Sequence, residues 1–288
     1  IFYMRTEAHA RRQVAALSGA RQALVLGGGL VGFKAAYGLL RRGIKVTMLS
    51  TSGYPLSLQV DEPAGKLILD QLLHHGLDVR VGVSVTAFEG KGAVAVAYTD
   101  SGETLPCDLV IIGKGVLPAL DFVPRELIEV DLGIVVDGNM QSSAAGIYAA
   151  GDAAETVDIA RQQPWVNAIW PEAAAQGRVA GFNMAGRQVA YPGSLSRNVM
   201  RIFDLDLMTL GYATPENPSA YRIFRSEDKR QQTYRSLVFD QDCLVGAVLI
   251  NQIEQGGILR GLIETRQPLS VPPSALMAPG FNFARLWR

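Results

Sequence analysis

The clearest pattern along the chain is a short apolar run, an amphipathic segment and a second apolar run within the first fifty residues. Residues 23–26 are apolar and end at glycines, residues 30–40 carry apolar side chains at helical spacing, and residues 44–49 follow the break at Gly43. This order predicts strand, helix and strand, which is the repeating unit of a parallel sheet.

The pattern continues with elements of both kinds. A helix is predicted over residues 6–17 ahead of the first strand and another over 61–75, where Gly76 ends it. Short strands are predicted over 78–81, 83–88, 93–99 and 109–112. The hairpin-rich stretch 90–102 predicts an antiparallel excursion from a mainly parallel sheet.

The second half of the chain has a different texture. Strands are predicted over 133–137 and 146–150, and a helix over 172–184 with Pro171 in its first turn. A hairpin over 232–239 and 244–250 precedes a helix over 257–265. From residue 267 onward we expect an extended arm whose aromatic residues need a surface to cover: Phe281, Phe283 and Trp287.

Composition and charge narrow the class of protein. The 288 residues include 27 Lys and Arg against 27 Asp and Glu, so no overall basic field favours a nucleic acid partner. A hydrophobic share of 48% excludes intrinsic disorder. No apolar run is long and uncharged enough to cross a membrane. The N-terminus does not begin with Met and lacks the apolar run of a secretory signal, so we expect a processed or truncated chain.

The two cysteines, Cys107 and Cys243, cannot form a disulfide framework in a chain of this length and are not in a C-x-x-C pair. A cytoplasmic location is therefore expected. Both cysteines are in or beside predicted strands and are interpreted as small core residues.

A glycine-rich motif directly follows the first predicted strand and opens a predicted helix. It fits G-x-G-x-x-G in the context that a dinucleotide-binding turn requires. The first glycine permits the tight turn, the second lets a pyrophosphate approach the backbone, and the third lets helix and strand pack closely. The alternative is a glycine-rich turn between core elements. The residues of the motif are Gly27, Gly28, Gly29, Leu30, Val31 and Gly32.

The end of the second strand normally carries an acidic residue that holds the adenosine ribose of NAD. Here Ser50 and Thr51 are at that place, with neither a carboxylate nor an arginine. Hydroxyl groups suit either cofactor, so the choice between NADH and NADPH stays open.

A second signal is the predicted strand that ends in Gly151 and Asp152. A carboxylate at this position can accept a hydrogen bond from a ribose or polyol hydroxyl. The alternative is an aspartate that caps the next helix or turn.

Four segments in this order, 27–32, 108–118, 146–152 and 165–184, resemble the FAD-dependent pyridine nucleotide-disulfide oxidoreductase family. The likeness is to its NADH oxidase, CoA-disulfide reductase and rubredoxin reductase branches, and it covers nearly the whole chain. It implies that the glycine motif binds the pyrophosphate of NADH or NADPH, that segment 113–118 closes against the nicotinamide, and that FAD is the second cofactor. Residues that the resemblance assigns to cofactor binding in the later segments are Gly113, Gly115, Gly151, Asp152, Trp170 and Ala173.

The resemblance also implies the fold class, which is α/β. We expect a lead-in from the FAD domain over 1–22 and a Rossmann-like NAD(P)H-binding domain with a β-hairpin excursion over 23–119. The C-terminal part of the FAD-binding domain is expected over 120–192, and an α+β dimerisation domain over 193–288. The helix after Pro171 would then direct its N–H groups near Ala173 at the flavin.

This sequence departs from the family pattern in two ways. Only about twenty residues precede the first strand, so we expect this chain to lack the FAD-binding N-terminal half. Any redox cysteine of the family would be in that half. Lys34 occupies a place where the family often has a glutamate near the reacting rings, so it is a candidate catalytic residue. The pair His74 and His75 does not suit one metal ion, and no metal site is predicted.

The function predicted from this reasoning is hydride transfer from NADH or NADPH to FAD, with electrons passing to an acceptor that the sequence does not identify. A disulfide, oxygen or a small redox protein would fit, and a homodimer is expected. The alternative is a nicotinamide-nucleotide-binding fragment or subunit whose flavin half is absent or supplied by another chain. A plain Rossmann dehydrogenase is a weaker alternative, because no Tyr-x-x-x-Lys motif is present.

Overall fold

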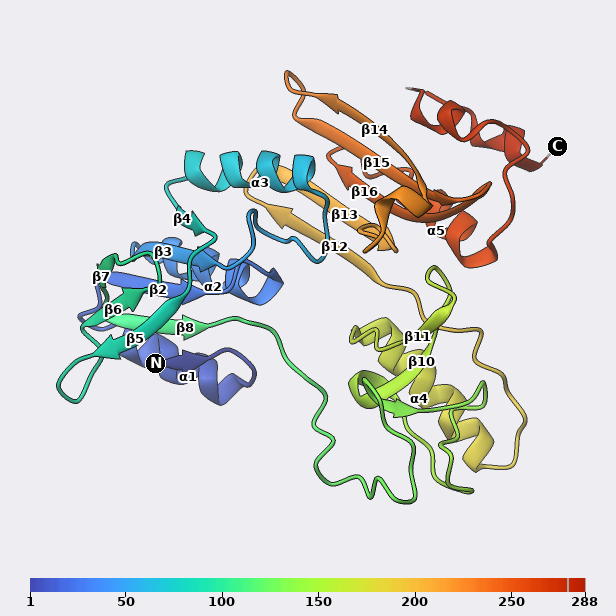
Figure 1. Ribbon diagram of the computed structural model, residues 1–288, viewed down its shortest axis with the longest axis horizontal. Coiled ribbons are helices and arrows are strands. Elements are labelled where there is room, and N and C mark those ends of the chain that lie inside the picture. The colour runs from blue at the N-terminus through green and yellow to red at the C-terminus, as the bar shows by residue number, and fades with distance from the viewer. Residues whose placement is uncertain (279, 288) are drawn as a thin grey trace. The chain divides into compact units, whose positions relative to one another are not determined.

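The computed structural model describes residues 1–278 and 280–287, and the chain divides into two compact units (Figure 1). The first unit contains residues 1–116 and 201–205. The second unit contains residues 117–200 and 206–288.

The first unit is built on a five-stranded parallel sheet with the order β1-β8-β2-β3-β4. Both faces of the sheet are buried. Leu24 and Val25, which are adjacent on β2 and point to opposite faces, are 1% and 0% exposed. The strands are β1 (Phe2–Tyr3), β2 (Gln22–Leu26), β3 (Lys45–Ser50), β4 (Asp78–Val81) and β8 (Leu109–Ile112). The prediction of a parallel α/β unit is confirmed.

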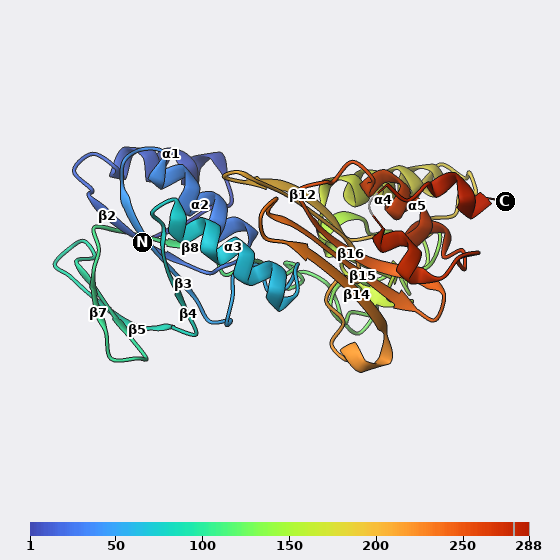
Figure 2. The same cartoon turned by 90° about the horizontal axis from the view of Figure 1, so that it is seen from above.

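Helices and a small antiparallel sheet cover this parallel sheet on opposite sides (Figure 2). The helices are α1 (Glu7–Ala16), α2 (Leu30–Leu40) and α3 (Glu62–His74). The antiparallel sheet contains β5 (Val85–Glu89), β6 (Val96–Thr99) and β7 (Thr104–Pro106). Ala97 and Cys107 share a core cluster with Leu24 of β2, so the predicted hairpin excursion packs onto the sheet.

The first part of the second unit combines a small sheet with one long helix. The sheet has the order β11-β10-β9, with β9 and β10 parallel and β10 and β11 antiparallel. The elements are β9 (Ile134–Val135), the 3-10 helix η1 (Gly151–Ala153), β10 (Ala154–Asp158), β11 (Gln163–Trp165) and α4 (Trp170–Met184).

The strand predicted over residues 146–150 does not form. The segment makes an isolated bridge from Tyr148 to Gln141, and Ile147 is 46% exposed. Its hydrogen bonds go to the segment just before it, since Ala149 donates to the Met140 carbonyl. A tight turn with Gly146 at φ +78° leaves room for a bridge but not for a longer ladder.

The rest of the second unit is centred on a five-stranded antiparallel sheet with the order β12-β13-β16-β15-β14. The predicted hairpin is confirmed as β15 (Thr233–Asp240) and β16 (Cys243–Ile250). The other strands, which the sequence did not reveal, are β12 (Arg197–Ile202), β13 (Leu205–Gly211) and β14 (Arg222–Asp228), with the short helix η2 (Pro218–Ala220) between the last two.

Helix α5 (Gly256–Thr265) and the C-terminal segment pack against the core of this sheet. The extended arm predicted from residue 267 is wrong, because the segment folds into two 3-10 helices, η3 (Pro273–Met277) and η4 (Phe283–Trp287). Phe283 is 6% exposed and shares a core cluster with Leu237 and Leu259. The aromatic residues therefore cover the chain's own sheet, while the Trp287 side chain lies outside the described residues.

In the part of the chain that the structure describes, no helix is both long and apolar enough to cross a bilayer.

Candidate functional site

The glycine turn after β2 is shaped by two close backbone approaches. Gly27 has φ +117°, and a Cβ at this position would lie 2.4 Å from the Gly113 carbonyl oxygen. A Cβ on Gly32 would lie 1.8 Å from the Gly27 carbonyl oxygen. Only glycine fits at these positions, which brings the start of α2 against the ends of β2 and β8.

Gly29 differs from these packing glycines because it faces open space. It is the N-cap residue of α2, and no side chain caps the helix there. A Cβ on Gly29 would meet nothing within 4 Å. An uncapped helix N-terminus with accessible N–H groups is a favourable place for a phosphate.

A cavity of about 570 Å³ opens at this turn, within the first unit. Its walls come from the carboxyl ends of parallel strands β2, β3 and β8, where open α/β sheets bind ligands. The predicted residues that line it are Gly27, Gly28, Gly29, Leu30, Val31, Ser50, Thr51, Gly113 and Gly115. Gly32 is buried below the turn.

The end of β3 presents neutral polar groups to the cavity. Ser50 is 4% exposed, and a Cβ on Gly28 would lie 2.6 Å from its Oγ. Thr51 is exposed, and Ser52 accepts a hydrogen bond from Ser57 at 2.8 Å. Within the described chain, the residues that line this cavity include no Asp, Glu or Arg, and Lys114 is the charged residue among them.

Lys34 lies on α2 outside the residues that line the cavity. It is exposed, and its Nζ is 5.6 Å from the ring centroid of Phe33. Its predicted catalytic role stays a prediction.

The structure brings the later predicted residues together in the second unit. The Gly151 N–H donates to the Gln176 Oε1 of α4 at 2.7 Å. Gly151 has φ +82°, and a Cβ there would lie 3.5 Å from the Ala173 Cβ. Asp152, half-buried in η1, is thereby held beside the first turns of α4.

The N-terminus of α4 is open in two respects. No side chain caps it, and Trp170, its first residue, is 92% exposed. A helix terminus of this kind can stabilise negative charge on a group placed before it.

A buried network that the sequence did not reveal anchors the same helix. Glu172 is 5% exposed and accepts hydrogen bonds from Tyr191 Oη and, at 2.6 Å, from Arg197. Burial, followed by the hydrogen bond to Glu172, raises the pKa of Tyr191. The sequence signal for this network is Glu172 directly after Pro171. The partners of Glu172, Tyr191 and Arg197, lie far along the chain and could not be identified from the sequence.

The cysteines are both free. Cys107 is buried, and burial raises the pKa of its thiol, which suits a core residue. Cys243 is half-buried and its thiol donates to the Arg266 carbonyl at 3.1 Å. Among the described residues, no group of three or more His, Cys, Asp or Glu side chains gathers where it could hold a metal ion.

Comparison with known proteins gives two family matches. Residues 1–177 match the model for pyridine nucleotide-disulphide oxidoreductases. Residues 197–267 match the model for the C-terminal domain of rubredoxin NAD+ reductase.

Two curated relatives cover most of the chain. It is 31% identical over 96% of its length to the epsilon subunit of NADH-dependent phenylglyoxylate dehydrogenase from Aromatoleum evansii, covering 65% of that protein. It is 26% identical over 85% of its length to NADH-rubredoxin oxidoreductase from Clostridium acetobutylicum, covering 58% of that protein. The chain thus spans less than two thirds of either relative.

Solved structures share the fold. A ferredoxin reductase from Rhodopseudomonas palustris has a TM-score of 0.86 at 20% identity, covering 99% of this chain and 69% of that one. The covalent complex of putidaredoxin reductase with putidaredoxin has a TM-score of 0.82 at 25% identity, covering 93% of this chain and 64% of that one.

Proposed function

This chain belongs to the pyridine nucleotide-disulphide oxidoreductase family, and from that premise we propose that it serves an FAD-dependent oxidoreductase that takes hydride from NADH or NADPH. The observation that carries the proposal is the glycine turn. Gly27 and Gly32 are required by packing, whereas Gly29 leaves the N-terminus of α2 open above a cavity. This is the geometry that a dinucleotide pyrophosphate needs.

In this proposal the residues of the first unit bind and orient the nicotinamide cofactor. Gly29, Leu30 and Val31 receive the pyrophosphate at the helix N-terminus, and Thr51 and Ser52 face the adenosine ribose. Gly113 and Gly115 form the wall at the end of β8. The bound cofactors supply the chemistry, which is hydride transfer from the nicotinamide to the flavin.

We assign the flavin contacts of this chain to the second unit. Asp152 would accept hydrogen bonds from the ribityl hydroxyls, and the backbone N–H groups near Ala173 would stabilise negative charge on the reduced ring. The hydrogen bond from Gly151 to Gln176 supports this assignment because it holds η1 beside α4.

We divide the chain into domains on the same family likeness. Residues 23–119 form the nucleotide domain and 120–192 the C-terminal part of the flavin domain, with 1–22 as its lead-in. We assign residues 193–288 to a homodimer interface, in a cytoplasmic enzyme. Light scattering of the purified chain tests the dimer, and a monomer at all concentrations would contradict it.

The electron acceptor is proposed as a class. The relatives include an NADH-rubredoxin oxidoreductase and an NADH oxidase from Methanocaldococcus jannaschii. A small redox protein, a disulfide or oxygen is therefore the acceptor to test first. Steady-state oxidation of NADH with each acceptor in turn would separate them.

A second candidate function is that of a nicotinamide-nucleotide-binding fragment or subunit. Its flavin-binding half would be absent or supplied by another chain. Large apolar side chains in residues 117–200 are unusually exposed, including Leu117 at 90%, Phe122 at 78% and Trp170 at 92%. Exposed apolar surface of this kind favours cover by further protein.

The test is the visible absorption spectrum of the purified chain, followed by anaerobic addition of NADH or NADPH. A flavin spectrum that bleaches with nucleotide would support the oxidoreductase. A colourless protein that still binds nucleotide would support the second function. A protein that binds neither would contradict both.

A further inference from the structure

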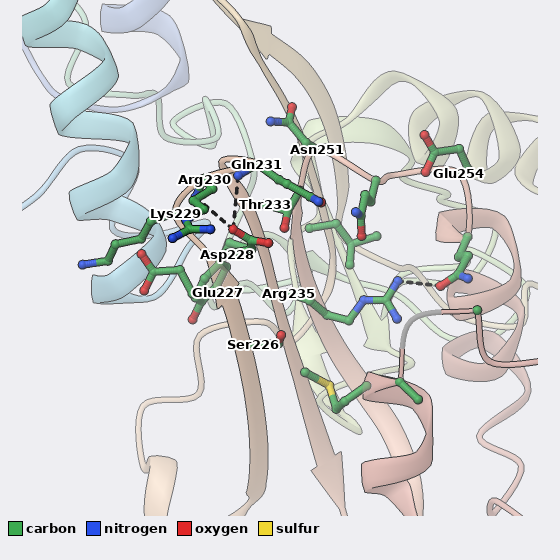
Figure 3. Close-up of a pocket in the computed structure, with 17 residues that line it drawn as sticks. Ser226, Glu227, Asp228, Lys229, Arg230, Gln231, Thr233, Arg235, Asn251 and Glu254 are labelled. Carbon is green, nitrogen blue, oxygen red and sulfur yellow. Dashed lines mark hydrogen bonds between the residues drawn. The ribbon is translucent and has the colours of Figure 1, made fainter.

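A second cavity, of about 830 Å³, lies beside the five-stranded antiparallel sheet of the second unit (Figure 3). It lies in the segment that we assign to a homodimer interface and takes no part in the nucleotide or flavin binding proposed above. We call it the Arg235 cavity. It is open between the sheet, the start of α5 and the C-terminal segment. The residues that line it near Arg235 include Thr233, Leu249, Asn251, Gln255 and Met277.

The strand register brings a cation and an apolar surface to the same face of the sheet. Arg235 of β15 is the cross-strand partner of Ser226 on β14 and of Leu249 on β16. Directly paired residues point to the same face of an antiparallel sheet. Leu249 is 1% exposed and lies beneath this face, and the partly buried Met277 is the apolar side chain that reaches the cavity beside the guanidinium.

The guanidinium of Arg235 is held by neutral acceptors. It donates to the Leu276 carbonyl at 2.7 Å and to the Gln255 Oε1 at 2.5 Å. In the part of the chain that the structure describes, no carboxylate pairs with it. Burial lowers the pKa of Arg235, with no acidic neighbour to offset this. Partial removal of a cation from water costs free energy when no opposite charge lies nearby. A bound anion would supply that opposite charge.

The acidic residues of the cavity lie apart from this guanidinium. Figure 3 shows Arg235 extending toward the α5 side, away from Glu227 and Asp228 at the hairpin tip. The Asp228 carboxylate accepts hydrogen bonds from the backbone of Arg230 at 2.9 Å and Gln231 at 3.2 Å. Glu254 also lines the cavity but makes no ion pair with Arg235.

We propose that the Arg235 cavity binds a small organic carboxylate, with its anionic head on the Arg235 guanidinium and its apolar body against Met277. The fork of N–H groups on arginine matches a carboxylate. Lys229 and Arg230 also line the cavity, but Figure 3 shows them at the hairpin tip with Glu227 and Asp228, so Arg235 is the cation that lies away from these charges. The volume is typical of a site for a small molecule.

The test is isothermal titration of the purified full chain with three probes: benzoate, its neutral analogue benzamide, and inorganic phosphate. We expect saturable binding of one benzoate per chain. Benzamide should bind about tenfold more weakly or worse, since it cannot make the charge-assisted hydrogen bond. Prior saturation with NADH should leave benzoate binding unchanged, because the nucleotide cavity is lined by other residues.

Two variants of Arg235 and one control locate the probe. Arg235→Met should abolish benzoate binding while the chain stays folded by circular dichroism, since an apolar side chain of similar size removes the desolvation cost. Arg235→Lys should weaken binding but keep the preference for benzoate over benzamide. Arg260→Gln removes an α5 arginine outside the cavity lining, paired with Glu264 at 2.7 Å, and should bind as the wild type.

Three results would overturn the proposal. One is the absence of saturable benzoate binding to the wild type at millimolar concentration, which would make Arg235 a structural link between β15, Gln255 and Leu276. Another is phosphate binding more tightly than benzoate. The third is unchanged benzoate binding in Arg235→Lys and Arg235→Met, which would place the carboxylate elsewhere.

Discussion

The imidazole ring of His75 lies flat on the phenyl ring of Phe203, with centroids 4.1 Å apart and planes inclined by 7°. His75 follows the last residue of α3, and Phe203 has its backbone at φ +51° in the turn between β12 and β13. The Nε2 of the same imidazole is 2.8 Å from Asp204 Oδ2. His75 is thus joined by ring stacking to Phe203 and by a hydrogen bond to Asp204, both far along the chain but within the first unit.

This contact predicts the effect of Phe203→Ala. Phe203 also meets the rings of Phe33 and Tyr37 edge-on, so the substitution removes a half-buried aromatic cluster. We expect the free energy of unfolding of the first unit to fall by about 1–3 kcal/mol, measured by urea denaturation. Phe122→Ala, at a side chain 78% exposed, is the control and should change it by less than about 0.5 kcal/mol. If Phe203→Ala and Phe122→Ala lowered the free energy of unfolding equally, the aromatic cluster around Phe203 would not be an important stabilising contact.

The glycine turn predicts opposite outcomes for two substitutions on one helix. Gly32→Ala places a Cβ 1.8 Å from the Gly27 carbonyl oxygen and should abolish NADH binding. Gly38→Ala places its Cβ 3.9 Å from the nearest atom, a guanidinium nitrogen of Arg42. It should preserve binding and stabilise α2 by about 0.5–1 kcal/mol. Nucleotide titration and thermal unfolding measure both, and normal binding by Gly32→Ala would contradict the role of the turn.

The neutral lining at the end of β3 predicts how cofactor preference can be changed. With hydroxyl groups at Thr51 and Ser52, the dissociation constants of NADH and NADPH should be similar. Thr51→Asp should weaken NADPH relative to NADH by about tenfold, because a carboxylate repels a 2′-phosphate and accepts from a 2′-hydroxyl. Fluorescence titration with each nucleotide is the measurement. Thr104→Asp, at an exposed position of β7 outside the cavity, should leave the ratio unchanged.

The Tyr191 and Glu172 pair predicts a dependence of stability on alkaline pH. The pKa of Tyr191 is raised in the folded chain above the ordinary value of 10.0. As the pH rises, Tyr191 therefore loses its proton in the unfolded chain before it does so in the folded chain. Its contribution to the free energy of unfolding is complete below pH 10 and declines as the pH rises above 10. Tyr191→Phe should cost about 1–2 kcal/mol at neutral pH and show a shallower decline above pH 10. Urea denaturation across this pH range is the measurement, and parallel curves for both proteins would refute the assignment.

Local sequence was a good guide where a pattern has a local cause. The predicted helix over 61–75 is α3 (Glu62–His74), and the strand over 109–112 is β8, because apolar periodicity and glycine stops act within a few residues. The strand predicted over 146–150 does not form because the tight turn at Gly146 leaves only an isolated bridge from Tyr148 to Gln141. Strand β14 gives little apolar signal because five of its seven residues are exposed. Strand β13 does alternate between buried and partly buried positions, so its pattern could have predicted it.

The sequence by itself determined the α/β class, the glycine turn and the order of the motifs, since each depends on residue types at short spacing. Tertiary structure alone decided that Ser50 is buried under Gly28 and that the aromatic tail covers its own sheet. It also decided the contacts of Glu172 with Tyr191 and Arg197 and of Arg235 with Leu276. These contacts join residues distant along the chain, and their energies arise only when the fold removes both partners from water.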